Sequence, residues 1–273
     1  MLRPGLLVDV GSIPEGAVLV DTRLALTGPT GRQRYDAGHI PGATYLDVDH
    51  DLAAPPGPGG RHPLPDAEQF TAAVRRAGIS RASQVVAYDE GPGTAAARLW
   101  WLMRDYGHGD VMVLDGGLAA WTASGRPLST DPVEPRPGDW SGVSGHLPVV
   151  EVDEVPHTAR DGVLIDVRAE PRFRGEDEPI DAVAGRIPGA VNAPLTGNTD
   201  DAGRFLPDDE LRPRFTALGV TDDVPVAAYC GSGVTATQTL LALRLAGFGD
   251  AALYPGSWSG WITDPSRPVA TGP

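Results

Sequence analysis

The sequence contains one cysteine, and its neighbours predict a reactive sulfur. Cys230 begins the run Cys-Gly-Ser-Gly-Val-Thr. Residues 224–229 before it are apolar, as in a short buried strand, and residues 235–246 after it carry leucines at helical spacing. A glycine-bearing loop at such a junction directs backbone amides and the positive end of a helix toward the sulfur. Both effects favour the thiolate, which is the nucleophilic form. A buried, inert cysteine is the alternative.

The composition restricts the partners of such a sulfur. A net charge of −14 argues against nucleic acid and against an anionic membrane surface. All 22 residues of the Lys and Arg class are arginines, which excludes Schiff-base chemistry by lysine. The negative field repels a small anionic substrate, so the local positive charge that binds one must come from arginine.

The sequence predicts a cytoplasmic protein without a membrane partner or cofactor. No stretch is apolar over the length of a membrane span, and residues 1–5 lack the apolar run of a signal peptide. A single cysteine forms no internal disulfide, which fits a reducing compartment. The six histidines and one cysteine form no set of ligands at zinc spacing, so we expect no metal.

The same motifs occur twice in the same order, about 140 residues apart. This repetition predicts two homologous domains, at residues 1–128 and 149–273, joined by a linker at 129–148 that is rich in Pro, Ser, Gly and acidic residues. The repeated pieces are an Asp-x-Arg motif at Asp21 and Asp166, a Gly-x-Ile-Pro-Gly-Ala motif at residues 38–43 and 185–190, the strand ends at Asp89 and Cys230, and a Gly and Trp pair at Gly116 and Trp121 and at Gly256 and Trp261.

Within each copy, strand-like runs alternate with helical patterns, which predicts an α/β fold with a mainly parallel sheet covered by helices on both faces. Ligands of such sheets bind beyond the carboxyl ends of the strands, where Cys230 is expected. Asp89 occupies the corresponding place in the first copy. A packing cysteine should have a small apolar counterpart, so this carboxylate favours a loop with a functional thiol in the second copy and a non-catalytic first copy.

Together these motifs, with the run Gly-Ser-Trp-Ser-Gly-Trp at 256–261, resemble the two-domain rhodanese family of sulfurtransferases over essentially the whole chain. Within that family, the Cys230 run is similar to that of the 3-mercaptopyruvate branch. Thiosulfate-preferring relatives usually carry two basic residues where this chain has Gly231 and Ser232. Cationic side chains help to bind the thiosulfate dianion. Mercaptopyruvate instead leaves as an enolate that needs a proton, which a hydroxyl at Ser232 can relay.

The resemblance also implies the partners of Cys230. It places Ser232 in a proton relay with His62 and Asp49, although His62 by itself has the surroundings of a solvated loop residue. It assigns the substrate carboxylate to an arginine that corresponds to Arg172. A second family arginine falls at Ile180 in this chain, and Arg186 is a candidate to compensate, with a surface charge as the alternative. We also expect the loop amides to form an anion-binding nest that stabilises the thiolate and the terminal sulfur; they belong to Gly231, Ser232, Gly233, Val234 and Thr235.

The expected reaction is therefore sulfur transfer. Cys230 takes the sulfur of 3-mercaptopyruvate as a persulfide, pyruvate leaves, and a thiol, a thioredoxin-like protein or cyanide accepts the sulfur. Thiosulfate is the alternative donor, and a non-catalytic rhodanese-like binding module is a further alternative, in which the thiol would normally be lost. A phosphatase needs an arginine where this chain has Ala236.

Overall fold

A computed structural model describes residues 5–25 and 27–273. These residues form two compact units. Unit 1 contains residues up to 54 together with 64–146 and 199–205, and unit 2 contains 55–63, 147–198 and 206–273. The units differ in detail from the predicted domains, because Pro55–Pro63 of the first repeat belong to unit 2 and Thr199–Phe205 of the second repeat belong to unit 1.

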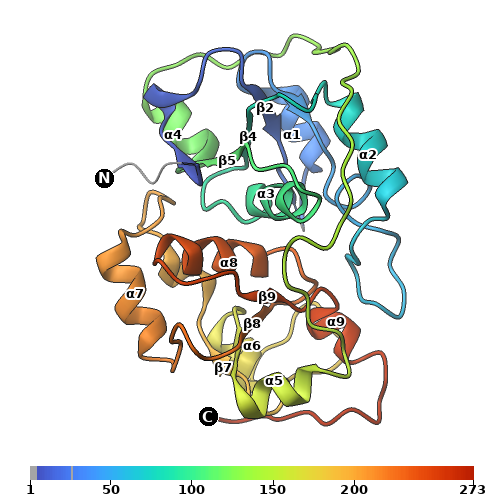
Figure 1. Cartoon of the computed structure of the whole chain (residues 1–273), viewed down its shortest axis with the longest axis vertical. Helices are drawn as coiled ribbons and strands as arrows, with labels where there is room; N and C mark the ends of the chain where they lie inside the picture. The colour runs from blue at the N-terminus through green and yellow to red at the C-terminus, as the bar shows by residue number, and fades with distance from the viewer. Residues whose placement is uncertain (1–4, 26) are drawn as a thin grey trace. The chain divides into compact units, whose positions relative to one another are not determined.

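Unit 1 contains a five-stranded parallel sheet with the strand order β1-β5-β4-β2-β3 (Figure 1). Mostly apolar residues, half of them valines, make up its strands β4 and β5, as burial on both faces requires. The strands are β1 (Leu7–Val8), β2 (Val18–Asp21), β3 (Thr44–Tyr45), β4 (Val85–Tyr88) and β5 (Val111–Leu114), and the helices are η1 (Val10–Ser12), α1 (Gly31–Ala37), α2 (Ala67–Arg76), α3 (Ala96–Asp105) and α4 (Gly117–Ala123).

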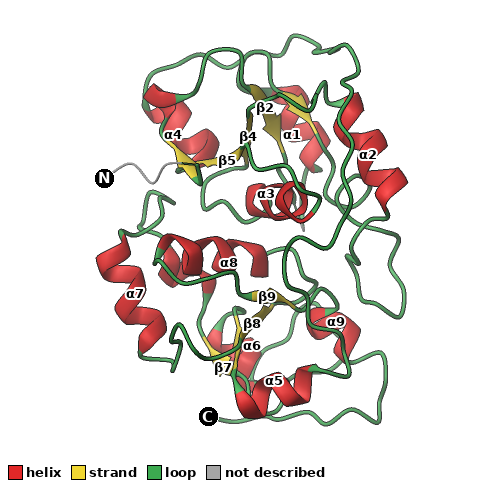
Figure 2. Ribbon diagram, viewed as in Figure 1, coloured by secondary structure: helices red, strands yellow, loops and turns green. Residues whose placement is uncertain are grey.

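Unit 2 repeats this plan with a four-stranded parallel sheet in the order β7-β6-β8-β9 (Figure 2). The predicted α/β fold with parallel sheets and helices is confirmed. The strands are β6 (Val163–Asp166), β7 (Val191–Asn192), β8 (Val226–Tyr229) and β9 (Ala252–Leu253), and the helices are α5 (Val155–Asp161), α6 (Glu170–Arg174), η2 (Leu195–Asn198), α7 (Asp208–Thr216), α8 (Ala236–Leu245) and α9 (Ser257–Trp261).

The strand register is the same in the two copies at the point that matters for the site. Asp21 pairs with Tyr88 in unit 1, and Asp166 pairs with Tyr229 in unit 2. The residue after each tyrosine is therefore the first beyond the carboxyl end of its strand. The two sheets place Asp89 and Cys230 at corresponding positions, each beside an Asp-x-Arg motif.

The segment predicted as a linker is largely part of unit 1. The Trp140 side chain is almost completely buried, and its ring packs edge-on against Phe70 at a centroid distance of 5.5 Å. Its carbonyl oxygen accepts a hydrogen bond from Nε of Arg75 at 2.7 Å. A large aromatic side chain removes enough apolar surface from water to hold such a segment in place. Residues up to His146 therefore belong to unit 1, where Trp140 contacts α2.

Across the described residues, no helix has the length and apolar character needed to cross a membrane.

Candidate active site

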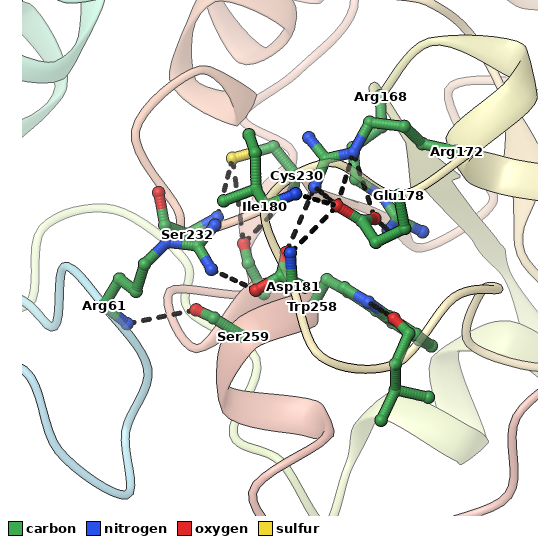
Figure 3. Close-up of polar contacts among 12 residues, drawn as sticks. Arg61, Arg168, Arg172, Glu178, Ile180, Asp181, Cys230, Ser232, Trp258 and Ser259 are labelled. Atoms are coloured by element: carbon green, nitrogen blue, oxygen red, sulfur yellow. Dashed lines mark hydrogen bonds and ion pairs between the residues drawn. The ribbon is translucent and has the colours of Figure 1, made fainter. Parts of the chain in front are cut away.

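Cys230 is the first residue after β8, and the residue is 2% exposed. We call residues 230–235 the Cys230 loop. The Sγ atom accepts a hydrogen bond from the backbone N–H of Gly233 at 3.1 Å and lies 3.5 Å from the N of Ser232 (Figure 3). Amide dipoles that point at a sulfur stabilise its negative charge. The geometry of the loop therefore suits a thiolate.

Gly233 allows this tight loop to form. Its φ of +85° lies in the left-handed region, and a Cβ at this position would lie 2.3 Å from the carbonyl oxygen of Pro255. No side chain fits in that space. Val234 next to it is buried, and Thr235 is the residue that precedes α8.

Ser257 forms a hydrogen bond with the backbone of the Cys230 loop, and the sequence prediction did not single it out. It adopts a φ of 51°, an uncommon value for a residue with a side chain. Its Oγ accepts a hydrogen bond from the N–H of Cys230 at 3.1 Å and lies 4.0 Å from Sγ. The next two amides, of Trp258 and Ser259, donate to the carbonyl oxygens of Cys230 and Gly231 at 2.9 Å. The recurrence of the Gly and Trp pair near both domain ends was the available signal for this role.

His62 lies at the Cys230 loop. Its Nδ1 atom is 2.7 Å from Oγ of Ser232, and the residue is 9% exposed. The histidine reaches the loop because Pro55–Pro63 belong to unit 2. The structure thus brings together two of the three residues of the expected relay. Asp49 belongs to unit 1, where its N–H donates to Oδ1 of Asp47, and its part in the relay stays a prediction.

Arg172, on α6, is held next to the loop by two carboxylates. Its Nε and Nη2 donate to both carboxylate oxygens of Glu178 at 2.7–3.1 Å, and Nη2 also donates to Oδ2 of Asp181 at 3.1 Å. Its two terminal nitrogens lie 3.5 and 3.6 Å from the place that a Cβ on Gly231 would occupy. The guanidinium therefore borders the residue that follows the nucleophile.

Arg61 is a second arginine at the same place, and the sequence prediction missed it. Its Nη2 lies 3.0 Å from the Cβ position of Gly231, and its Nη1 is paired with Oδ1 of Asp181 (Figure 3). The backbone N–H of Arg61 donates to Oγ of Ser259 at 3.0 Å. The residue stands directly before His62 in the sequence, which was the available signal.

Arg186 is engaged away from these residues. Its Nη1 donates to the carbonyl oxygen of Gly272 at 2.6 Å, and its guanidinium lies over the ring of Phe173 at 4.3 Å. These contacts hold the C-terminal residues against α6, so we do not include Arg186 in the substrate site proposed below. Ile180, at the place of the second family arginine, is 45% exposed.

The carboxylate that holds Arg172 stays ionised. Burial of Glu178 opposes its ionisation, but hydrogen bonds from Arg172 and from two backbone N–H groups outweigh this effect. The pKa of Glu178 is therefore held below its ordinary value of 4.5. A charged Glu178 keeps Arg172 in a fixed orientation at the loop.

The corresponding loop of unit 1 shows where negative charge is stabilised. In the Asp89 loop (residues 89–95), Oδ1 of Asp89 accepts the N–H groups of Gly91 and Gly93 at 3.0 and 3.1 Å. Oδ2 accepts those of Ala95 and Ala96 at 2.8 and 3.2 Å. The first copy therefore forms an anion-binding nest, filled by its own carboxylate.

The site of unit 2 consists of a thiol, a histidine, hydroxyls and arginines. Over the part of the chain that is described, no three or more His, Cys, Asp or Glu side chains gather as a metal site would require.

Comparisons with known proteins identify the family. A model of the rhodanese-like domain matches residues 11–124 and 151–264. A probable 3-mercaptopyruvate sulfurtransferase of Pseudomonas aeruginosa is 49% identical over 93% of this chain and 92% of its own length. A putative thiosulfate sulfurtransferase, SseB, of Mycobacterium tuberculosis is 39% identical over 93% and 90%. The crystal structure of SseA from Escherichia coli, a 3-mercaptopyruvate enzyme, aligns with a TM-score of 0.80 at 34% identity, over 90% of this chain and 94% of that one. The chain thus belongs to the rhodanese family, with two rhodanese-like domains in tandem.

Proposed function

We propose that this protein is a sulfurtransferase that takes sulfur from 3-mercaptopyruvate onto Cys230, releases pyruvate and passes the sulfur to an acceptor. The observation that carries the proposal is the juxtaposition in unit 2 of a thiol bound by loop amides with Ser232 and His62, 2.7 Å apart. Relatives at 49% and 36% identity are named for this donor.

The first half-reaction begins with attack of the Cys230 thiolate on the donor sulfur. An S–S bond forms, the C–S bond breaks, and its electron pair goes to the methylene carbon, which gives the enolate of pyruvate. The donor thiol proton ends on that carbon, so a thiolate and a thiol give a persulfide anion and pyruvate. Ser232 and His62 are placed to carry this proton. In this proposal Asp49 orients the histidine, as the resemblance implies.

The loop amides stabilise the charge on the terminal sulfur of the persulfide. The amides of Gly91 and Gly93 already hold a carboxylate in the Asp89 loop. Ser232 and Val234 stand at the corresponding places of the Cys230 loop. A persulfide extends the side chain of Cys230 by one atom, toward the volume that the carboxylate fills in the other copy. We therefore assign the amides of Gly231, Gly233, Val234 and Thr235, with that of Ser232, to sulfur binding.

Thiosulfate is the second candidate donor. It is favoured by the two guanidinium groups beside Gly231, since thiosulfate is a dianion, and by the 39% identity to a putative thiosulfate sulfurtransferase. Against it, the carboxylates of Glu178 and Asp181 offset these positive charges. A non-catalytic binding module has no need of the thiol that this chain retains.

Mass spectrometry of the intact protein after mixing with 3-mercaptopyruvate tests the proposal. We expect the wild type to gain one sulfur atom and the Cys230→Ser variant to gain none. A gain in the variant contradicts the role of Cys230. The ratio of kcat/KM for the two donors decides between them, and a large preference for thiosulfate selects the second candidate. Cyanide, small thiols and a thioredoxin-like protein are the acceptors to compare, and a cytoplasmic location remains a prediction.

A further inference from the structure

Two arginines from distant parts of the sequence meet beside the residue that follows the nucleophile. Nη2 of Arg61 lies 3.0 Å, and the terminal nitrogens of Arg172 lie 3.5 and 3.6 Å, from the Cβ position of Gly231. Arg61 comes from the segment Pro55–Pro63 and Arg172 from α6, both in unit 2. Two planar cations at one point form a site for an anion that can accept hydrogen bonds from both.

A carboxylate already occupies this place. Asp181 places one carboxylate oxygen on Nη1 of Arg61 and the other on Nη2 of Arg172, at 3.1 Å for the second pair (Figure 3). Its side chain is 3% exposed. The pair of guanidinium groups is thus shown to hold a carboxylate beside the Cys230 loop. The carboxylate belongs to the protein itself, in the irregular segment that also contains Ile180.

The two arginines are held to different degrees. Arg172 is 16% exposed and keeps two further hydrogen-bonded contacts to Glu178, so it stays in place if Asp181 leaves. Arg61 is 33% exposed, and Asp181 is the carboxylate with which the structure pairs it. An incoming carboxylate that replaces Asp181 leaves both guanidinium groups paired, so the exchange costs little electrostatic energy.

We propose that Arg61 determines donor specificity. Together with Arg172 it binds the carboxylate of the sulfur donor, and Asp181 fills that place until the donor displaces it. The inference rests on the proposed function and adds to it the second arginine, which the sequence lacks at Ile180. It also gives Asp181 a function, as an internal competitor of the donor.

Arg61 precedes His62, so the test must separate carboxylate binding from an indirect effect on the histidine. Mercaptoacetone has the same thiol and ketone as 3-mercaptopyruvate and lacks the carboxylate. For Arg61→Gln we expect kcat/KM with 3-mercaptopyruvate to fall about 10- to 100-fold, mostly through KM. With mercaptoacetone we expect a change below about threefold, because no carboxylate is bound. The matched control is Arg174→Gln, an exposed arginine of α6 paired with Glu170, which should leave both donors unaffected.

Equal losses for the two donors would overturn the inference, because Arg61 would then act through His62. An unchanged value with 3-mercaptopyruvate would overturn it as well. Asp181→Asn tests the exchange. It removes the competing charge, so KM for 3-mercaptopyruvate should fall about three- to tenfold, with mercaptoacetone unaffected. A rise in KM would mean that Asp181 only positions the arginines, which contradicts the exchange.

Affinity for pyruvate separates this inference from the proposed function. Pyruvate carries the carboxylate and lacks the sulfur, so its binding needs no chemistry at Cys230. Ligand-observed NMR should show a dissociation constant about tenfold or more higher in Arg61→Gln than in the wild type. If the wild type takes no sulfur from 3-mercaptopyruvate but shows this difference, the proposed donor is wrong and the carboxylate site stands. If sulfur transfer occurs without the difference, the inference fails alone.

Discussion

The Asp89 loop and the Cys230 loop follow corresponding strands in identical register, but they treat negative charge differently. Asp89 satisfies four backbone N–H groups with a permanent carboxylate. Cys230 presents a sulfur that accepts the N–H of Gly233 at 3.1 Å and lies 3.5 Å from the N of Ser232. The first loop contains its anion as part of the fold, whereas in the proposed reaction the second acquires one and releases it. Under that proposal, the duplicated loop provides structure in one copy and chemistry in the other.

The charged side chains beside the two loops also differ. Arg23 of the first Asp-x-Arg motif lies 3.7 Å from Glu90, a side chain that is 60% exposed. Arg168 of the second lies 3.3 Å from Glu178, which is 3% exposed and also holds Arg172. Both motifs hold a buried Asp–Arg pair, and in unit 2 the buried charges extend from Arg168 through Glu178 to Arg172.

Replacing Cys230 by aspartate converts the second loop into the first, and should give the largest effect. Without a thiolate, sulfur transfer should fall by at least about a thousandfold. The new carboxylate can accept the loop amides, so the thermal midpoint should stay the same or rise. Persulfide formation and calorimetry measure the two effects. Cys230→Ser is the control, with the same loss of activity and no gain in stability.

The Cys230 loop has a hydroxyl at Ser232, whereas the Asp89 loop has Gly91 at the corresponding position. In Ser232→Ala, kcat with 3-mercaptopyruvate should fall about 100-fold, because the enolate loses its proton relay. Polysulfide loads Cys230 without forming an enolate, so its rate should change little. The His62→Gln variant should show the same pattern, and the double variant should be no worse than either single one. Additive losses would mean that the two residues do not act together.

Truncating Asp89 tests the structural copy. In Asp89→Ala, four N–H groups of a buried loop lose their acceptor, so unit 1 should lose about 2–3 kcal/mol of stability. Hydrogen exchange should accelerate at residues 91, 93, 95 and 96. Asp89→Asn retains one acceptor oxygen and should lose less. Unchanged exchange at these amides would contradict the assignment of a filled nest.

The smallest effect concerns the dependence of stability on pH. Because the pKa of Glu178 is lowered in the folded protein, its charge stabilises the fold above the ordinary value of 4.5, and this contribution is lost as the pH falls through the folded value. At pH 7, Glu178→Gln should lower the free energy of unfolding of unit 2, by less than Asp89→Ala lowers that of unit 1. The difference from the wild type should shrink below pH 4.5 in urea unfolding. Glu90→Gln, which removes one exposed carboxylate from unit 1, is the matched control for the loss of a charge at pH 7.

Much of the fold and part of the site could be predicted because their signals are local. The strand before Cys230, the helix after it and the duplication all follow from patterns within each repeat. The cap of α2 is also local, and Asp66 does accept the N–H of Gln69 at 2.8 Å. The spacing of Asp66 and Gln69 is also that of a capping box, in which the side chain of Gln69 would bond back to the N–H of Asp66. This side chain donates to the carbonyl oxygens of His50 and Ala53 instead, contacts that depend on packing.

Which arginines lie beside the Cys230 loop could be predicted from the sequence only in part. Arg172 and Arg186 were both candidates, and only Arg172 lies beside Gly231, while Arg186 holds the chain end. Arg61 was overlooked because its segment lies within the first repeat, yet it belongs to unit 2. Spacing along the chain carries no information about such a position, since the contacts of an irregular segment are set by packing between distant residues.

By itself, the sequence determined the class of chemistry: a single thiol at a strand end, an arginine-only supply of positive charge, and a repeat whose other copy carries Asp89. Tertiary structure alone decided which groups surround that thiol. It placed Nδ1 of His62 at 2.7 Å from Oγ of Ser232, and Oγ of Ser257 on the N–H of Cys230. It also placed the carboxylate of Asp181 between Arg61 and Arg172. The physical reason is that strands and helices follow from hydrogen bonds and periodicity over a few residues, whereas a site at the end of a sheet gathers loops whose positions depend on the burial of the whole unit.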